Sequence, residues 1–408
     1  MSYVPNFVVV SDPELVKEVF SAGPDELHAG KANVVLKPFL GEYSLLMLDG
    51  AEHLRQRKLL LPPFHGERLA TYGETMINSA LATIAKWPAT RSFTMHEEFQ
   101  EITLDIIIRT VFGVNDETRA DEMARSMREM LNLAANPFLL IPKFQIDLGP
   151  LSPWGRFTRK LKKADALLYS ELQRRREKPD PSKQDILSLL LRARDDDGSA
   201  MSDKELRDEL VTLLVAGHET TATALAWTFR WLLANRSLYR ELGDEVRAST
   251  ENGKLIADRI GRLPLLDAVI RESLRLQPVV PMVGRIVQKP VKLAGYDLPV
   301  GTAIGPSIYL IQRRLGLYQD PSRFHPRRFI DHKWSPHEWF PFGGGIRRCI
   351  GMAFALYEMK MIIAAVLART SLVIDETAPP TMIRRSITLA PKGGVRVRQQ
   401  ERPMQGGS

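Results

Sequence analysis

The chain is poor in cysteine: its 408 residues include one, Cys349. A single cysteine excludes an internal disulfide and a zinc site built from four cysteines. Free thiols are typical of reducing compartments, so we expect a cytoplasmic protein.

The sequence also lacks the segments that would carry it into a membrane or onto nucleic acid. No apolar run is long enough to span a bilayer, and the first residues have no basic segment of the kind that opens a signal peptide. The formal charge of +8 is spread along the chain and is not gathered in a basic arm with interleaved aromatic residues. We therefore expect no transmembrane segment and no nucleic-acid partner, whereas the positive charge suits an acidic protein partner.

Helical periodicity dominates what is present, and there is no internal repeat, low-complexity tract or obvious interdomain linker. A short strand and a helix capped at Ser11 or Asp12, with Pro13 in its first turn, are expected near the start. These patterns predict a mainly α protein with small β-sheets, as one domain over residues 1–408. The further helices are expected at 51–60, 67–86, 95–112, 117–133, 154–177, 183–195, 202–234, 236–250, 263–275 and 350–368, and strands at 7–10, 284–288, 291–294, 302–308, 370–374 and 385–389.

The one cysteine stands just before the last expected helix, in the stretch FGGGIRRCIG (342–351). Free N–H groups and the positive end of the helix dipole would face its sulfur and stabilise a thiolate. The three glycines at 343–345 let the backbone fold tightly and approach something flat and large. A buried structural cysteine is the alternative, but the clustering of glycine, arginine and an aromatic residue favours a thiolate ligand.

A second stretch, AGHETT (216–221), lies inside a long apolar helix, where glycine and threonine are locally unfavourable. A hydroxyl there can take over a backbone hydrogen bond and open a notch in the helix. The alternative is a distorted helix with a solvated glutamate.

Two pairs of polar residues have the spacing of one helix face. Glu272 and Arg275 are three residues apart, and His53 and Arg57 are four apart. A surface salt bridge and a surface or structural histidine are the ordinary explanations.

The motif around the cysteine has a known counterpart. F-x-x-G-x-R-x-C-x-G, read as Phe342, Gly345, Arg347, Cys349 and Gly351, resembles the haem-binding signature of the cytochrome P450 monooxygenases. The resemblance implies a P450 fold and haem b as cofactor, with the Cys349 sulfur as the axial ligand of the iron. Phe342 would shield that sulfur, and Arg347 would pair with a haem propionate.

The same resemblance assigns roles to the other motifs. Ala216 and Gly217 would lie over the oxygen-binding face of the haem, with Gly217 supplying the cavity for O2, and Glu219 and Thr220 would be the acid–alcohol pair that delivers protons. The remaining assignments are propionate contacts at His53, Arg57 and Arg285, and a buried structural triad of Glu272, Arg275 and Arg328.

The resemblance also implies an apolar substrate pocket. Family positions that face the substrate correspond to Val215, Ala216, Val280 and Ile387, and the roof of the pocket to about 131–160. A fatty acid or a terpenoid is the expected substrate class.

The implied function is insertion of one oxygen atom from O2 into this substrate by hydroxylation or epoxidation. Electrons would come from NAD(P)H through a ferredoxin reductase and a ferredoxin, with Arg313, Arg314 and Arg348 as candidate docking residues on a monomer. The alternatives are a peroxygenase driven by hydrogen peroxide, against which the intact acid–alcohol pair argues, and a non-enzymatic haem sensor. The chain departs from the family at its start, where a few dozen residues that usually precede the first strand are expected to be missing.

Overall fold

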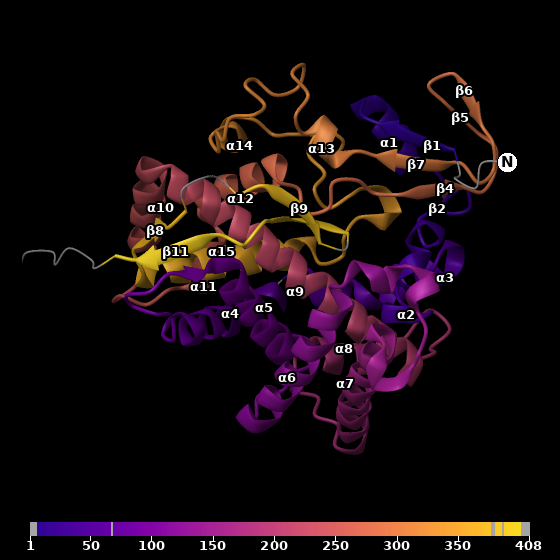
Figure 1. Ribbon diagram of the computed structural model, residues 1–408, viewed down its shortest axis with the longest axis horizontal. Coiled ribbons are helices and arrows are strands. Elements are labelled where there is room, and N and C mark those ends of the chain that lie inside the picture. The colour runs from indigo at the N-terminus through magenta and orange to yellow at the C-terminus, as the bar shows by residue number, and fades with distance from the viewer. Residues whose placement is uncertain (1–5, 67, 377–379, 386, 401–408) are drawn as a thin grey trace, which may run out of the picture.

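A computed structural model describes residues 6–66, 68–376, 380–385 and 387–400 (Figure 1). Helices and small sheets make up the fold, as predicted. The α-helices are α1 Pro13–Ser21, α2 Lys37–Leu40, α3 Gly50–Leu60, α4 Arg68–Ile84, α5 Met95–Thr110, α6 Glu117–Ala134, α7 Pro153–Glu177, α8 Ile186–Arg192, α9 Asp203–Ala234, α10 Arg236–Ala248, α11 Ala257–Gly261, α12 Pro264–Leu276, α13 Ile308–Ile311, α14 Arg328–Asp331 and α15 Met352–Arg369. Short 3₁₀ helices include Lys31–Leu36, Pro137–Leu140 and Gly345–Arg347.

The strands form four small sheets. One has the order β1-β7-β4-β2, in which β1 and β7 are parallel, and another has the order β3-β11-β8; β5–β6 and β9–β10 are antiparallel pairs. In Figure 1 the four-stranded sheet and α1 lie at the opposite end of the molecule from α10, β8 and β11. The strands are β1 Phe7–Val10, β2 Leu27–His28, β3 Phe93–Thr94, β4 Arg285–Val287, β5 Val291–Leu293, β6 Tyr296–Leu298, β7 Ala303–Pro306, β8 Leu372–Ile374, β9 Met382–Arg385, β10 Thr388–Pro391 and β11 Arg396–Gln399.

The strand predicted at 385–389 is wrong, because the chain reverses inside it. β9 ends at Arg385, β10 begins at Thr388, and these two residues pair across the turn. The alternation of polar and apolar residues through this stretch does not distinguish one strand from two that meet at a tight turn. The start of α1, in contrast, is as predicted, since the Asp12 side chain accepts a hydrogen bond from the Glu14 N–H.

The long helix α9 is the central element of the core. It begins with a capping box in which the Ser202 and Glu205 side chains satisfy each other's backbone N–H groups. Its apolar residues occur on all sides, so most of the helix is buried, and it packs against α5, α7, α12 and α15. Away from the two ends of α9, Ala216 is the one residue that is exposed.

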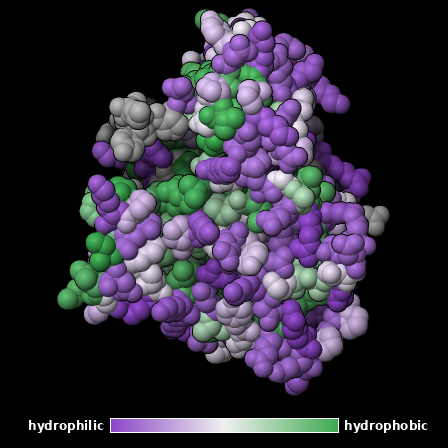
Figure 2. Space-filling model, turned by 90° about the vertical axis from the view of Figure 1, so that its right-hand side faces the viewer, coloured by the Kyte–Doolittle hydropathy of each residue, from purple (hydrophilic) through white to green (hydrophobic). Residues whose placement is uncertain are grey.

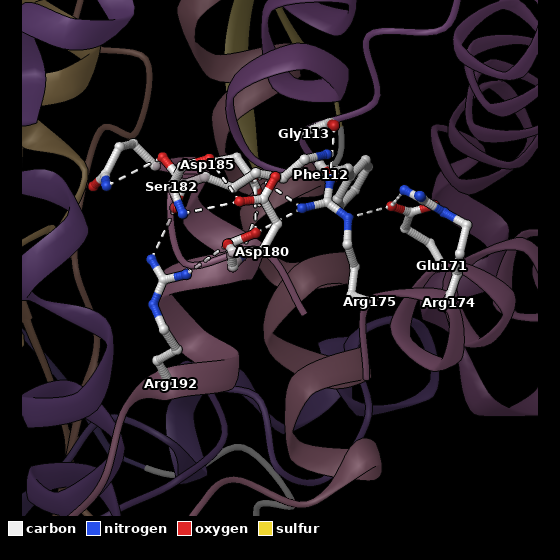
Figure 3. A network of polar contacts seen from close by, with 12 residues as sticks. Phe112, Gly113, Glu171, Arg174, Arg175, Asp180, Ser182, Asp185 and Arg192 are labelled. Carbon is white, nitrogen blue, oxygen red and sulfur yellow. Dashed lines mark hydrogen bonds and ion pairs between the residues drawn. The ribbon is translucent and has the colours of Figure 1, made fainter. Parts of the chain in front are cut away.

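A buried arginine ties the lower helices together (Figure 3). Arg175 of α7 bonds Glu171 at 2.7 Å, Asp185 at 3.0 Å and the carbonyl oxygens of Phe112 and Gly113. Gly113 has φ +63°, and a Cβ there would lie 2.3 Å from the Asp185 carboxyl carbon, so only glycine fits. This network joins α7, the N-terminus of α8 and the end of α5.

The outer surface is predominantly polar. Figure 2 shows one face, on which hydrophilic residues cover most of the area and hydrophobic residues gather in smaller patches between them. Across the described ranges, no helix combines the length and the apolar character needed to cross a membrane.

Candidate active site

Cys349 lies between a 3₁₀ turn and the start of α15. Its N–H donates to the Phe342 carbonyl oxygen at 3.0 Å, which closes the loop that precedes the helix. The side chain is exposed, yet the surrounding protein is close enough for burial to be the largest influence on the pKa of the thiol. This combination indicates a thiol on the wall of an internal space and not on the outer surface.

The pKa of the Cys349 thiol is raised above its ordinary value, and burial is the main cause. The Gly351 N–H and the charges of Arg57 and Arg348 act in the opposite direction without outweighing burial. The protein alone therefore favours the neutral thiol, and a bound cation is needed to hold a thiolate at this position.

Four basic side chains from distant parts of the chain lie close enough to influence one another's charge, and one of them, Arg57, also acts on this sulfur. His53 and Arg57 come from α3, Arg285 begins β4, and Arg347 ends the turn before Cys349. Burial and the charges of Arg347 and Arg57 lower the pKa of His53 to about 3, so it is neutral. Burial and Arg347 lower the pKa of Arg285 to about 10. Each positive side chain makes the protonated form of its neighbours less favourable, as expected of a cluster in which basic groups outnumber anions.

One carboxylate serves this cluster among the described residues. Asp49 forms an ion pair with Arg347 and also accepts the N–H groups of Ala29, Gly30 and Lys31. Arg285 donates to two carbonyl oxygens, of Gly284 at 2.8 Å and Gly344 at 3.5 Å. His53 Nδ1 is buried without a hydrogen-bond partner in the described part of the chain, and no hydrogen bond or ion pair joins the Arg57 side chain to another described residue.

This donor set fits haem. A thiol on an internal wall could ligate iron, and a cluster with too few anions would receive two propionate groups, which carry the missing negative charge. Cys349 would hold the iron, and His53, Arg57, Arg285 and Arg347 would face the propionates. Among the described residues no three His, Cys, Asp or Glu side chains gather in a metal-binding arrangement.

Two of the glycines before Cys349 lie against α1. A Cβ at Gly344 would lie 2.1 Å from the Phe20 ring, and one at Gly345 would lie 2.2 Å from the Phe20 carbonyl oxygen. Gly345 also has φ +64°. The small size of Gly344 and Gly345 thus admits α1, and the approach of these glycines to a flat ligand stays a prediction. A Cβ at Gly351 would lie 3.9 Å from the Cys349 sulfur.

The middle of α9 opens at Ala216, which is exposed although long buried stretches flank it on the same helix. Thr220 Oγ1 donates to the Ala216 carbonyl oxygen at 2.5 Å, so the hydroxyl does engage the backbone there while α9 stays continuous. A Cβ at Gly217 would lie 3.3 Å from Ile107 of α5, so the glycine admits that helix, and its role in forming an O2 cavity stays a prediction.

Glu219 turns away from this opening toward α5 and β9. Its carboxylate accepts from Gln100 Nε2 at 2.6 Å and lies 3.5 Å from His96 Nε2 and 3.6 Å from Arg385 Nε. Burial raises its pKa, but His96, Arg385 and Gln100 outweigh burial and lower the pKa below its ordinary value. The predicted acid is therefore ionised, and sequence reasoning missed all three of its partners.

The structure brings Glu272, Arg275 and Arg328 together in the core. Glu272 pairs with Arg275 at 2.7 Å and Arg328 at 3.1 Å, and neither Glu272 nor Arg275 is exposed. Gln312, which the sequence did not single out for a role, is also fully buried. Its Nε2 donates to the Leu274 and Arg275 carbonyl oxygens, and its backbone carbonyl oxygen accepts from Arg275 Nη1.

Two of the segments predicted to contact the substrate, those that contain Val280 and Ile387, meet at β10. The Leu389 N–H donates to the Val279 carbonyl oxygen at 2.8 Å, and Trp227 of α9 donates to the Leu389 carbonyl oxygen at 3.0 Å. Val215 and Val280 are half-buried, whereas Ile387, in the turn before β10, is 42% exposed.

Two signals in the sequence could have revealed the missed residues. Asp49 begins the helix that carries His53, and His96 and Gln100 have the i, i+4 spacing of one face of α5. The partnership of Arg385 with Glu219 joins residues 166 positions apart (385 − 219), and no local pattern encodes it.

Known proteins share this architecture. A family model described as Cytochrome P450 matches residues 4–396. A protein named cytochrome P450 135B1 from Mycobacterium tuberculosis is 39% identical over 401 residues, which span 96% of this chain and 82% of that protein. One named cytochrome P450 135A1 from the same species is 36% identical over 398 residues, with 97% and 86% covered. The solved structure of a cyanobacterial CYP120A1 bound to retinoic acid matches with a TM-score of 0.84 at 25% identity, covering 97% of this chain and 89% of that one.

The predicted family and fold are thus confirmed, and the family carries with it a haem cofactor and oxidoreductase chemistry. A family model over nearly the whole chain, and relatives well above 30% identity over more than four-fifths of their own length, show that the chain belongs to the cytochrome P450 monooxygenases.

Proposed function

We propose that this P450 binds haem b through the Cys349 sulfur and inserts one oxygen atom from O2 into an apolar small molecule. The observation that carries the proposal is the sole cysteine on an internal wall beside buried basic groups with too few anions. When bound, haem supplies the iron at which O2 is activated, and a thiolate ligand favours cleavage of the O–O bond.

The proposal assigns proton delivery to Glu219 and Thr220. The Thr220 hydroxyl lies beside the exposed stretch of α9 and can turn from the Ala216 carbonyl oxygen toward a ligand. The neighbouring carboxylate is the nearest group on α9 that can carry a proton, and its partners keep it ionised between transfers. In this proposal Glu219 carries the proton, and the Thr220 hydroxyl donates a hydrogen bond over a short distance.

Thr220→Ala tests this assignment. The variant should fold and bind haem and substrate, since the hydroxyl bonds one helix carbonyl oxygen and the β-carbon remains. Without the hydroxyl, protons should no longer reach the correct oxygen, so NAD(P)H consumption should continue while product falls and hydrogen peroxide rises. A variant that yields as much product per NAD(P)H as the parent, with a substrate that has no hydroxyl group, contradicts the assignment.

Two further substitutions separate the parts of the proposal. Glu219→Gln should slow the whole cycle, because the proton supply itself is impaired. Cys349→Ala should lose most haem and the red-shifted absorption band of the CO complex, and Cys349→His should bind haem without oxygenating. Full activity in either cysteine variant would remove the thiolate from the proposal.

The peroxygenase alternative makes a different prediction. A peroxygenase uses hydrogen peroxide directly and needs no acid–alcohol pair, whereas here Glu219 has three ordered partners. Turnover with peroxide alone at the rate seen with a complete electron-transfer chain would favour the peroxygenase. A haem sensor would bind O2 or CO without product under either condition.

A ferredoxin, fed by its reductase and NAD(P)H, is the proposed electron donor, since the chain carries a formal charge of +8 and ferredoxins are acidic. The predicted docking residues need revision. Arg314 pairs with Asp12 at 2.8 Å, and Arg313 lies 3.8 Å from the Tyr309 ring centroid and is partly buried. Arg348 remains exposed beside Cys349, and its removal should weaken ferredoxin binding at low salt.

A fatty acid or terpenoid is the proposed substrate class, bound by a monomeric single-domain enzyme in a reducing compartment. Val215, Ala216, Val280 and Ile387 offer apolar side chains and no charge. The structural relative that binds retinoic acid supports a long apolar ligand with a polar end. Spectral titration with fatty acids, sesquiterpenes and steroids would identify the class, and binding confined to charged or small polar compounds would overturn it.

A further inference from the structure

Glu219 has an unusual position for a residue that must move protons. Its Oε2 accepts a short hydrogen bond from Gln100, and its Oε1 faces His96 and Arg385 at 3.5 and 3.6 Å. Oε1 makes no hydrogen bond within the described part of the chain. One carboxylate oxygen is thus held firmly, while the other is attracted by two basic groups without being bonded to either.

The hydrogen-bond pattern fixes which ring nitrogen of His96 carries hydrogen. Arg385 Nη1 lies 3.2 Å from His96 Nδ1, and a guanidinium can only donate. Nδ1 must therefore accept, and in the neutral ring the hydrogen sits on Nε2. That nitrogen lies 3.2 Å from Thr223 Oγ1 and faces Glu219. Arg385 thus acts on the carboxylate twice: by its own charge and by aiming the His96 N–H at it.

Arg385 comes from a different part of the fold than the other partners. It is the last residue of β9, with its side chain 36% exposed, whereas His96 and Gln100 lie on α5. The β9–β10 hairpin is anchored to α9 through Trp227. The charge state of Glu219 therefore depends on where the hairpin holds one arginine.

We propose that His96 and Arg385 are positioning residues for the proposed proton-delivery acid, with Arg385 acting as a latch that holds the Glu219 carboxylate turned toward α5. The inference rests on the proposed role of Glu219. The β9–β10 hairpin, which carries Arg385, thereby sets the position of the acid's carboxylate.

Other charged groups near Glu219 do not account for the effect. His218 is buried on α9 and its pKa is lowered to about 4 by burial, so it is neutral at physiological pH. Its Nδ1 is 2.9 Å from Thr103 Oγ1. Arg128 of α6 forms an ion pair with Glu101, and its charge is one of the smaller causes of the lowered pKa of His218. The lowering of the Glu219 pKa thus comes from His96, Arg385 and Gln100.

The test is a pH titration of the Glu219 carboxyl in the haem-loaded protein. Carboxyl-labelled glutamate gives a ¹³C NMR signal, which Glu219→Gln assigns by removing it. In Arg385→Gln the midpoint of this signal should move to higher pH, because the nearby positive charge that favours the carboxylate is gone. The acidic limb of the pH profile for turnover should move in the same direction, and Arg385→Lys should recover part of both shifts.

Arg384→Gln is the matched control. It removes the same charge from the preceding residue of β9, whose side chain is exposed where that of Arg385 is half-buried. We expect the Glu219 midpoint in this variant to match that of the parent. An unchanged midpoint in Arg385→Gln, or an equal shift in Arg384→Gln, overturns the latch.

The inference and the proposed function can fail separately. If Thr220→Ala uncouples NAD(P)H consumption from product while Arg385→Gln leaves both the midpoint and the pH profile unchanged, only the latch is wrong. If Arg385→Gln shifts the carboxyl midpoint but Thr220→Ala and Glu219→Gln behave like the parent, the latch exists and the assigned proton delivery is wrong.

Discussion

Two buried arginines ten residues apart have opposite surroundings. Arg275 is fully buried and donates both to Glu272 and to the carbonyl oxygens of Gln312, Pro321 and Arg323. Arg285 is 6% exposed and donates to two carbonyl oxygens, with no carboxylate partner in the described part of the chain. Burial of a charge is costly unless it is paired. The satisfied arginine therefore belongs to the scaffold, and the unsatisfied one is best explained by a ligand that brings the missing anion.

The largest effect should follow from breaking the satisfied group. Arg275→Ala leaves Glu272 buried with Arg328 as its remaining cation, and we expect a loss of about 3–5 kcal/mol in the free energy of unfolding. Urea unfolding and haem content after purification measure it. Arg262→Ala is the control, since Arg262 forms an exposed pair with Asp258 and should change stability by about 0–1 kcal/mol. Equal stability of the two variants would place the triad among ordinary salt bridges.

Substitution of the unsatisfied arginine should act on haem and not on folding. Arg285→Gln removes one of several mutually repelling cations, so the haem-free protein should unfold at the same temperature as the parent or a higher one. Haem should dissociate faster, because a charge-assisted hydrogen bond contributes about 1.5–3 kcal/mol. Stopped-flow transfer of haem to an acceptor protein gives the rate. Destabilised apoprotein with unchanged haem release would show that Arg285 belongs to the scaffold like Arg275.

This contrast also shows how far the sequence could lead. Local motifs singled out Arg275, Cys349 and Glu219, and the family resemblance added Arg285. The motifs could not reveal that Asp49 forms an ion pair with Arg347, or that Asp12 forms one with Arg314, because these pairs join residues about 300 positions apart. They also did not reveal that Arg313 lies over the Tyr309 ring. Most helices were predictable from periodicity. The two-residue strands β2 and β3 were not, since they exist through pairing with distant strands.

A pH experiment sharpens the comparison at His53, a member of the unsatisfied cluster. Burial and neighbouring arginines lower its pKa to about 3 in the folded protein, against 6.5 for the free side chain. Below pH 6.5 the unfolded chain therefore takes up a proton that the folded chain refuses, so stability is complete above pH 6.5 and falls between 6.5 and 3. Denaturant unfolding of the haem-free protein across this range should show a shallower fall in His53→Phe. Parallel curves for the two proteins would mean that His53 is charged in the fold.

A third kind of buried group forms no ion pair in the described part of the chain. Glu358 of α15 is 1% exposed, and its Oε1 has no hydrogen-bond partner in the described part of the chain. Burial raises its pKa to about 8, against a smaller opposing effect from a hydrogen bond with Thr221 of α9. The Glu358 carboxyl is therefore neutral at pH 7. It avoids the cost of a buried charge by staying protonated, whereas Arg275 offsets that cost by pairing with Glu272.

Glu358→Gln tests this, because an amide resembles a neutral carboxyl in size and charge. The unfolded chain ionises near pH 4.5 and the folded one near pH 8, so the parent's stability is complete below pH 4.5 and is lost as the pH rises toward 8. The variant lacks this slope. We expect equal unfolding free energies at pH 4.5 and a gradual gain of the variant over the parent up to pH 8, measured by urea unfolding at fixed ionic strength. A constant difference across the range would show that Glu358 is ionised in the fold, and that a positive partner must then reach it.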